Sequence, residues 1–265
     1  MGKLEIKFST AEMLLITSAM KISAFQNLGT ANQSYTNDEL KTMLAAARDS
    51  LLARGLVRVT EQEGKAVLDL HPIVKAAVGV AARPEKGWWL TITGKDQKPS
   101  SIFFSWTEKL IIRNWVTPEG IFCFEQVAEA ALPAEIVRFS RVTLQNDHDT
   151  QAEYRIPITV LDTIVKDEHP TSFEWSQLTQ FGIAENDAAQ LLEALTSPSE
   201  RCILIAVSHL RDHPETIGLA VWLTVPDQIW LMEQAPDTVD IAILKKTSGD
   251  HVLGAVSELV QRTLS

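Results

Sequence analysis

Two stretches near the start of the chain have the pattern of a helix N-terminus. Ser9–Glu12 and Thr36–Glu39 each place a hydroxyl residue three positions before a Glu. This is the spacing of a capping box, in which the hydroxyl accepts from a first-turn N–H and the carboxylate accepts from the cap's own N–H. Apolar residues then recur at helical spacing. We therefore expect one helix that runs to about Phe25 and a second over 37–54, ended by Gly55.

The next segment predicts a short hairpin and a third helix. Apolar and β-branched runs at 56–59 and 66–70 flank a polar turn, and Pro72 opens a helix that ends near Arg83. Two capped helices, a hairpin and a further helix are typical of a winged-helix arrangement. The N-terminal segment is therefore expected to be winged-helix-like.

From Gly87 the pattern changes to short β-branched and aromatic runs separated by turns. These runs predict an antiparallel meander with strands at 88–93, 101–106, 109–116 and 121–125. A helical pattern over 128–144 follows. Residues 145–154 are polar and charged, and we expect them to connect two halves of the chain, 1–146 and 147–265.

The second half repeats this order. Helical patterns come first, at 156–165, 172–181 and 186–195. Strand-like runs follow at 202–207, 217–224, 229–233 and 239–244. A closing helix has one apolar face, formed by Val252, Leu253, Val256, Leu259 and Val260. We therefore expect a pseudo-twofold α+β fold, with antiparallel sheet meanders flanked by helices and both halves in one continuous body.

One pair of segments is similar in sequence as well as in order. Residues 115–126 and 222–234 each read as a strand, a turn that contains Pro118 or Pro226, and a returning strand that ends on Glu-Gln. Shared turn chemistry is one explanation, because such turns recur widely. The other is an internal duplication at a spacing of 107 to 108 residues, which would make the two hairpins equivalent.

Composition narrows the class of protein. With 265 residues and 45% hydrophobic content, the chain can bury a core of its own. Its apolar runs are far shorter than the ~20 residues of a membrane span, so we expect no signal peptide or membrane anchor and a cytoplasmic location. Cys123 and Cys202 lie inside apolar runs, where a Cys behaves as a small reduced hydrophobe, and we expect no disulfide.

Charge is unevenly distributed along the chain. The net charge is −10, yet residues 1–86 hold eleven Lys or Arg against nine Asp or Glu, whereas residues 87–265 hold thirteen against twenty-five. Because nucleic acids are bound by clustered cations, any nucleic-acid interaction must depend on the first third of the chain.

His209, Asp212, His213 and Glu215 form the best candidate for a metal site. A metal needs several ligands that converge at ~2 Å, and the surrounding pattern instead predicts a loop between strands, so we expect no metal there. Asp147–Asp149 and Glu153 lie in the polar connection and are expected to be solvated. The other histidines lie at or near helix starts: His71, His169 and His251.

Motifs of catalysis are absent from the sequence. There is no Gly-x-Ser-x-Gly elbow, neither Cys stands beside a His, and no glycine-rich phosphate loop is present. We therefore expect a protein that is not an enzyme and that has no catalytic residues and no cofactor.

The second helix has the wrong chemistry for reading DNA. It starts with Asp38 and Glu39, and its cations are Lys41, Arg48 and Arg54. A recognition helix would bring those acids against phosphates. We therefore interpret the winged-helix-like segment as structural, and keep a winged-helix DNA-binding regulator as the alternative.

Aromatic pairs are the feature that points most directly to a binding surface. Adjacent residues on a strand point to opposite faces, so Trp88 and Trp89, like Phe103 and Phe104, place large rings on both sides of the sheet. Helices of the same chain could cover both faces. Alternatively, one Trp belongs to a partner-binding surface, since aromatic residues are enriched at interface hot spots. Trp88 and Trp89 are the predicted partner-binding residues.

Several segments of the first third carry a resemblance to a known family: Ala11–Leu15, Tyr35–Leu40, Ser50–Leu56 and Leu68–Pro72. In their order and hydrophobic pattern the chain resembles the EspG-type chaperones of type VII secretion and their uncharacterised relatives. The resemblance implies a pseudo-twofold α+β fold with a central sheet. It also implies a non-enzymatic cytoplasmic protein that binds a helical partner, although no motif fixes an individual binding residue.

Two functions from different classes follow. The first is a protein-binding chaperone or adaptor, for secretion substrates if the resemblance holds. The second is a winged-helix DNA-binding transcriptional regulator. An apolar surface that bears a Trp on the sheet would favour the first, and a basic groove beside residues 37–54 would favour the second.

Overall fold

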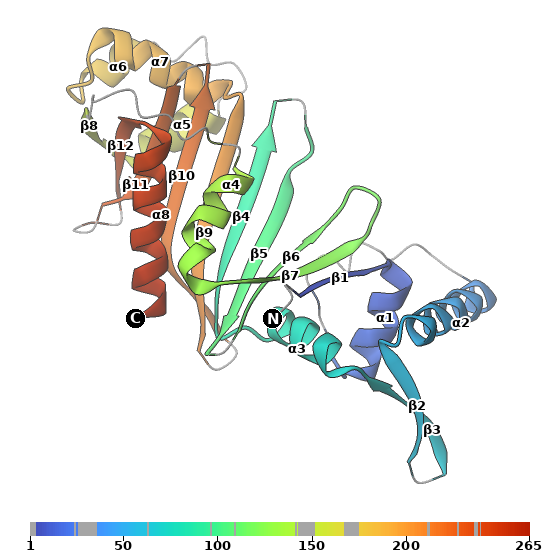
Figure 1. Cartoon of the computed structure of the whole chain (residues 1–265). Coiled ribbons are helices and arrows are strands. Elements are labelled where there is room, and N and C mark those ends of the chain that lie inside the picture. Colours follow the sequence, from blue (N-terminus) through green and yellow to red (C-terminus); the bar gives the residue numbers. More distant parts are fainter. Residues whose placement is uncertain are drawn as a thin grey trace. The chain divides into compact units, whose positions relative to one another are not determined.

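The structure is a computed structural model. It describes the chain except for residues 1–3, 24, 26–35, 63, 96, 109, 141, 143–151, 167–174, 211, 212, 227, 236, 237 and 239. The chain divides into two compact units, Met1–Gly87 with Ile102–Glu129 and Trp88–Ser101 with Ala130–Ser265. Each unit combines helices with antiparallel strands (Figure 1), so the predicted α+β class is confirmed.

The first unit begins its helical part with α1 (Thr10–Ala19) and α2 (Asn37–Ala53). Both predicted capping boxes are present, on Ser9 and on Thr36. The prediction that the first helix runs to Phe25 is wrong, because the chain turns into the left-handed region at Lys21 with φ of 55°. Lys21 and Ile22 then donate back to the last helical turn, as in a Schellman motif.

The same type of ending closes α2, at the glycine that the sequence indicated. Gly55 has φ of +66°, and Leu56 N donates to Leu51 O at 2.9 Å. The hairpin β2 (Val57–Gln62) and β3 (Lys65–Leu70) follows, and then α3 (Pro72–Ala82), which Pro72 opens. The hairpin projects away from the three helices (Figure 1).

The sheet part of the first unit has the strand order β1-β7-β6-β5, all antiparallel. Its strands are β1 (Glu5–Phe8), β5 (Ser100–Thr107, from Ile102 onward in this unit), β6 (Leu110–Val116) and β7 (Phe122–Val127). β1 was not predicted as a strand. It contributes Ile6 and Phe8 to a core that includes Met13 and Ile16 of α1, Leu51 of α2 and Val74 of α3.

The second unit has the strand order β4-β9-β10-β11-β12-β8. Its strands are β4 (Lys86–Gly94, from Trp88 in this unit), β8 (Glu153–Pro157), β9 (Glu200–Leu210), β10 (His213–Val225), β11 (Gln228–Gln234) and β12 (Ile241–Thr247). β8 corrects a prediction, because residues 153 and 154 were expected in a connection and Ile156 in a helix. Ile156 is instead a buried strand residue opposite Ala242.

Helices cover both faces of this sheet. α4 (Leu132–Phe139) and α8 (Gly249–Leu264) contact each other, and α8 contacts β9 and β10. α5 (Ile158–Lys166), α6 (Trp175–Thr179) and α7 (Glu185–Thr196) enclose a core with Val221 and Leu223. α8 packs on β10 at Gly218, whereas α7 shares a core with Val221 of the same strand. Residues three positions apart on a strand point to opposite faces, so α8 and α7 lie on opposite faces of the sheet.

α4 is shorter than the predicted helix over 128–144. A 3₁₀ turn at Glu129–Ala131 precedes it, and Pro133 lies in its first turn, where the missing N–H costs no helical hydrogen bond. Ser140 caps its end. The rest of the predicted range, from residue 143, lies outside the described residues.

The order of elements repeats along the chain, as predicted. In each repeat an opening strand pairs antiparallel with the last strand of a four-strand meander, β1 with β7 and β8 with β12. A helix follows each meander, α4 and α8. The division of the chain at 146 and 147 stays a prediction.

The residue-level duplication is wrong. The turn at Pro118 joins the third and fourth strands of its meander, whereas the turn at Pro226 joins the second and third strands. Shared turn chemistry therefore explains the similarity of the two hairpins.

Candidate functional site

The two predicted tryptophans lie on β4 and have opposite environments. Trp88 is 1% exposed and Trp89 is 43% exposed. Phe103 and Phe104 on β5 are both buried. The sequence therefore placed large rings on both faces correctly, and the structure shows that Trp89 alone of these four presents a broad surface to solvent.

Other apolar residues extend the surface around Trp89 across neighbouring strands. β4 lies beside β9, and Lys95 N donates to Ser199 O at 3.1 Å where these strands meet. On β9, the side chain of Ile205 is half-buried. Ile205 is the partner of Leu219 on β10, and β4, which carries Trp89, is the neighbouring strand on the other side of β9.

Leu219 and its neighbour Ile217 complete this surface. They are 40% and 38% exposed, although large aliphatic side chains are more often buried. We name the set Trp89, Ile205, Ile217 and Leu219 the Trp89 surface. All four belong to the second unit.

An apolar hollow adjoins the Trp89 surface where α5 and α7 lie over the sheet. Its volume is about 410 Å³. Apolar side chains form most of its wall, from α5, α7 and the strands: Ile158, Leu161, Leu195, Ile203, Leu219 and Met232. Arg201 lies at the hollow and donates to Leu195 O at 2.9 Å, which joins β9 to the end of α7.

A polar network holds α7 against the other end of the sheet. Lys246 of β12 donates to Asp187 and Gln190 of α7, both at 2.9 Å. Tyr154 of β8 donates to the second oxygen of Asp187 at 2.8 Å. Burial, together with the neighbouring carboxylate of Asp187, raises the pKa of Tyr154 above its ordinary value. The phenol therefore stays protonated and keeps this link at neutral pH.

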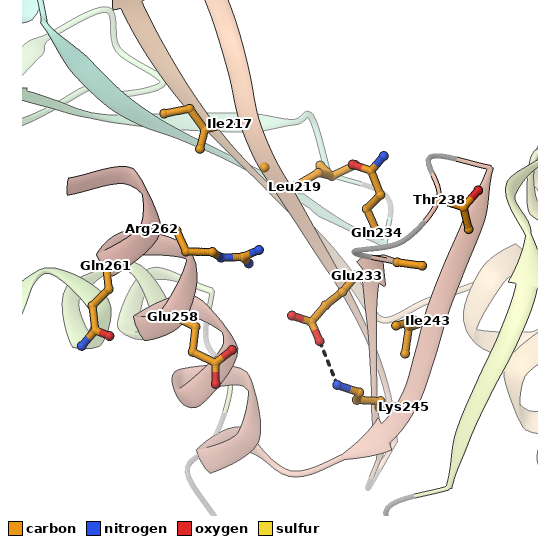
Figure 2. A pocket seen from close by; sticks show the side chains of 12 residues that line it. Ile217, Leu219, Glu233, Gln234, Thr238, Ile243, Lys245, Glu258, Gln261 and Arg262 are labelled. Carbon is orange, nitrogen blue, oxygen red and sulfur yellow. Dashed lines mark hydrogen bonds and ion pairs between the residues drawn. The ribbon is translucent and has the colours of Figure 1, made fainter. Parts of the chain in front are cut away.

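A second and larger groove lies beside Ile217 and Leu219. Figure 2 shows it between α8 and the strands β10 to β12, with a volume of about 970 Å³. Ile217, Leu219 and Ile243 supply apolar lining, and α8 contributes polar side chains that include Arg262. Glu233 and Lys245 form an ion pair at 3.1 Å within the groove. Sequence analysis missed this groove, since it depends on where neighbouring strands end.

The histidines that the sequence marked as metal candidates lie on two neighbouring strands. The prediction of a loop at His209 and His213 is wrong, because these residues lie at the adjoining ends of β9 and β10. Glu215 is an exposed residue of β10. Among the described residues, no group of three or more His, Cys, Asp or Glu could hold a metal ion.

The remaining titratable candidates have structural positions or cannot be placed. Asp147–Asp149, His169 and Asp212 lie outside the described residues, and Glu153 is in β8. His71 caps α3 by accepting from Ile73 N, and the His251 ring lies 3.0 Å from the Ser248 hydroxyl at the start of α8.

Both cysteines are buried thiols, as expected for small reduced hydrophobes. Burial raises the pKa of the Cys123 thiol, which disfavours the reactive thiolate.

The cations of α2 are occupied by neighbouring acids. Lys41 pairs with Asp38 at 3.5 Å and Arg48 with Asp49 at 2.9 Å. Arg54 pairs with the buried Glu12 at 3.0 Å and also donates to Lys7 O. A groove that binds phosphates needs cations directed at the ligand, so this surface does not support the DNA-binding alternative.

None of the described helices is long and apolar enough to cross a membrane. No family model matches the chain, and no curated protein matches it.

A solved structure does match. The chain is similar to the Mycobacterium tuberculosis type VII secretion system chaperone EspG5, solved in complex with the PE25-PPE41 dimer. The match covers 98% of this chain and 96% of the EspG5 chain, with a TM-score of 0.71 and 12% sequence identity. The resemblance that the sequence suggested is thereby confirmed for the fold: this chain has an EspG-like α+β fold.

Proposed function

We propose that this protein is a non-enzymatic chaperone or adaptor that binds a protein partner through the Trp89 surface. The observation that carries the proposal is the exposure of Trp89 on β4 and of Leu219 and Ile217 on β10, all within one unit. Large apolar side chains that lie together on a surface mark sites of protein interaction. Trp is also among the residues that contribute most to binding energy when a partner buries them.

The EspG-like fold supports the same class of function. EspG5 is a chaperone whose structure contains a bound PE25-PPE41 protein dimer. By analogy with that chaperone, the partner of this chain is a protein with a helical part, encountered in the cytoplasm before secretion. The analogy is one of fold, and the proposal for this chain depends on its own surface.

Affinity purification from the native cell extract tests the proposal. Wild type and two variants serve as bait, Trp89→Ala and the control Val59→Ala, which removes an exposed apolar side chain of the hairpin β2–β3. We expect a protein that wild type and Val59→Ala retain and Trp89→Ala loses. Recovery of DNA in place of protein, or equal recovery of the protein by all three baits, would contradict the proposal.

A further inference from the structure

The groove of Figure 2 lies where one strand ends and its neighbour continues. β11 pairs with β10 only from Ala220 to Val225, whereas β9 pairs with β10 from His213 onward. Within the described residues, Glu215–Leu219 therefore has a strand partner on its β9 side and none on its β11 side. The backbone groups along that open side are those that pair with a strand in a continuing sheet.

One end of the groove reaches this open edge. It touches three successive residues of β10, Ile217, Gly218 and Leu219, and the successive residues Glu233, Gln234 and Ala235 at the end of β11. Successive residues of a strand point to opposite faces, so a groove over one face would touch alternate residues. At β10 the groove touches three residues in a row and so reaches the edge of that strand, whereas at β12 it touches the alternate residues Ile243 and Lys245 and so lies over the face of the sheet that α8 covers.

The walls of the groove indicate which side chains an incoming segment needs. The apolar side chains of Ile217 and Leu219 are exposed and would be covered by an incoming segment. Ile217 is the extra residue of a β-bulge between Thr216 and Gly218. Bulges of this kind redirect a side chain and are frequent beside functional sites. An incoming segment therefore gains both backbone hydrogen bonds and apolar contact.

Charge on α8 adds a polar requirement. Figure 2 shows the guanidinium of Arg262 extending from α8 toward the strands, and it forms no ion pair with any residue that the structure describes. The nearby carboxylate of Glu233 is already bound to Lys245 at 3.1 Å. Glu258, one helical turn before Arg262, lines the same groove without forming an ion pair with it, so a carboxylate on the incoming segment can pair with Arg262.

We propose that an extended segment of a protein partner adds to the open edge of β10 as a further strand, with apolar side chains against Ile217 and Leu219 and an acidic side chain toward Arg262. This inference rests on the proposed function and states which part of the partner is held. Leu219 lines the groove and also belongs to the Trp89 surface, so one partner can contact both. Pairing along Glu215–Leu219 takes a segment of about 17 Å.

A phage-displayed library of linear 12-residue peptides, selected on the full chain, tests the inference with peptides as the probe in place of the partner. Selected peptides are then synthesised with one backbone N-methyl group at each position in turn. A methyl group blocks a hydrogen bond only where the N–H points at β10, so we expect affinity to fall at alternate positions. A helical peptide would show no period of two.

Variants of the protein locate the binding. We expect Ile217→Lys and Arg262→Gln each to weaken the selected peptides at least tenfold, because edge lysines oppose strand addition and the acidic residue loses its partner. Val59→Lys and Arg48→Gln, at an exposed apolar strand residue and an exposed helix cation outside the groove lining, are the matched controls and should bind as wild type. Trp89→Ala should also leave peptide binding unchanged, which separates this result from the test of the proposed function.

Three results would overturn the inference. The first is that no selected peptide depends on Ile217 for binding. The second is that the N-methyl series shows no period of two. The third is that a second copy of the chain occupies the edge of β10 in solution. If the peptides behave as expected while no cellular protein depends on Trp89, the proposed function fails and the strand site stands.

Discussion

At Gly218, α8 packs closely against the sheet. A Cβ atom added there would lie 2.6 Å from Leu259 Cδ1, and Leu259 is buried with little room to move. The missing side chain therefore allows the close packing of helix on strand that forms one wall of the groove.

We predict that Gly218→Ala lowers the free energy of unfolding by about 1–3 kcal/mol, since overpacking forces a buried neighbour aside. Gly254→Ala is the matched control, because Gly254 lies in α8 with nothing within 4 Å of an added Cβ. That change should stabilise by about 0.5–1 kcal/mol through helix propensity. Urea denaturation measures both, and a loss of equal size at the two positions would contradict the packing argument.

Glu12 is the other residue on which local structure depends. Its carboxylate accepts from Ser9 N, from the Ser50 hydroxyl at 2.8 Å and from Arg54 at 3.0 Å. Glu12 is 5% exposed. Besides closing the capping box of α1, it contacts Ser50 and Arg54 at the end of α2, and Arg54 also donates to Lys7 O of β1. Sequence predicted the capping box, but the contacts with Ser50 and Arg54 require the packed helices.

We predict that Glu12→Gln destabilises the first unit by about 1–2 kcal/mol, because charge-assisted hydrogen bonds are lost while Arg54 remains half-exposed to solvent. Glu39→Gln removes the equivalent capping box on the exposed start of α2 and should have a smaller effect. Thermal unfolding of the two variants compares them directly. A larger loss for Glu39→Gln would show that the contacts with α2 and Arg54 contribute nothing.

Among the elements, the two short edge strands were the hardest to predict. β1 and β8 contain four and five residues, too few for alternation to stand out from a helical pattern. Each is recognised as a strand only through its partner, β7 or β12, which lies far along the chain. The meander strands are longer and richer in β-branched residues, so their positions were predicted within a few residues.

The link between α7 and the sheet should depend on pH. The pKa of Tyr154 is raised in the folded protein, so the folded state holds this proton more tightly than the unfolded state. The resulting stabilisation is complete below the ordinary tyrosine pKa of 10.0 and is lost as pH rises through the higher folded value.

We predict that stability falls more steeply above about pH 10 in wild type than in Tyr154→Phe, which cannot ionise. Denaturation midpoints at a series of alkaline pH values measure the difference. Parallel curves for the two proteins would show that the Tyr154–Asp187 contact does not govern this dependence.

At the scale of the whole chain, sequence predicted the class, the repeated order of elements and the EspG-like fold. It predicted the alternation of Trp88 and Trp89 but not which ring would be covered, because that depends on the helices above each face. The open edge at Glu215–Leu219 was also missed. Sequence analysis began that strand at residue 217, whereas β10 starts at His213 and outruns the seven residues of β11. How far one strand extends beyond its neighbour is set by their pairing, and the local sequence pattern does not show it.

The central claim is that the sheet surface around Trp89, and not α2, binds the partner. The most direct measurement is the Kd of the recovered partner protein for wild type, for Trp89→Ala and for the double variant Lys41→Gln/Arg48→Gln. We predict that Trp89→Ala weakens binding by about 2 kcal/mol, or ~30-fold in Kd. The double variant should bind as wild type, since both cations are exposed and already paired with acids. Loss of binding in the double variant, with Trp89→Ala unaffected, would contradict the account and favour the DNA-binding alternative.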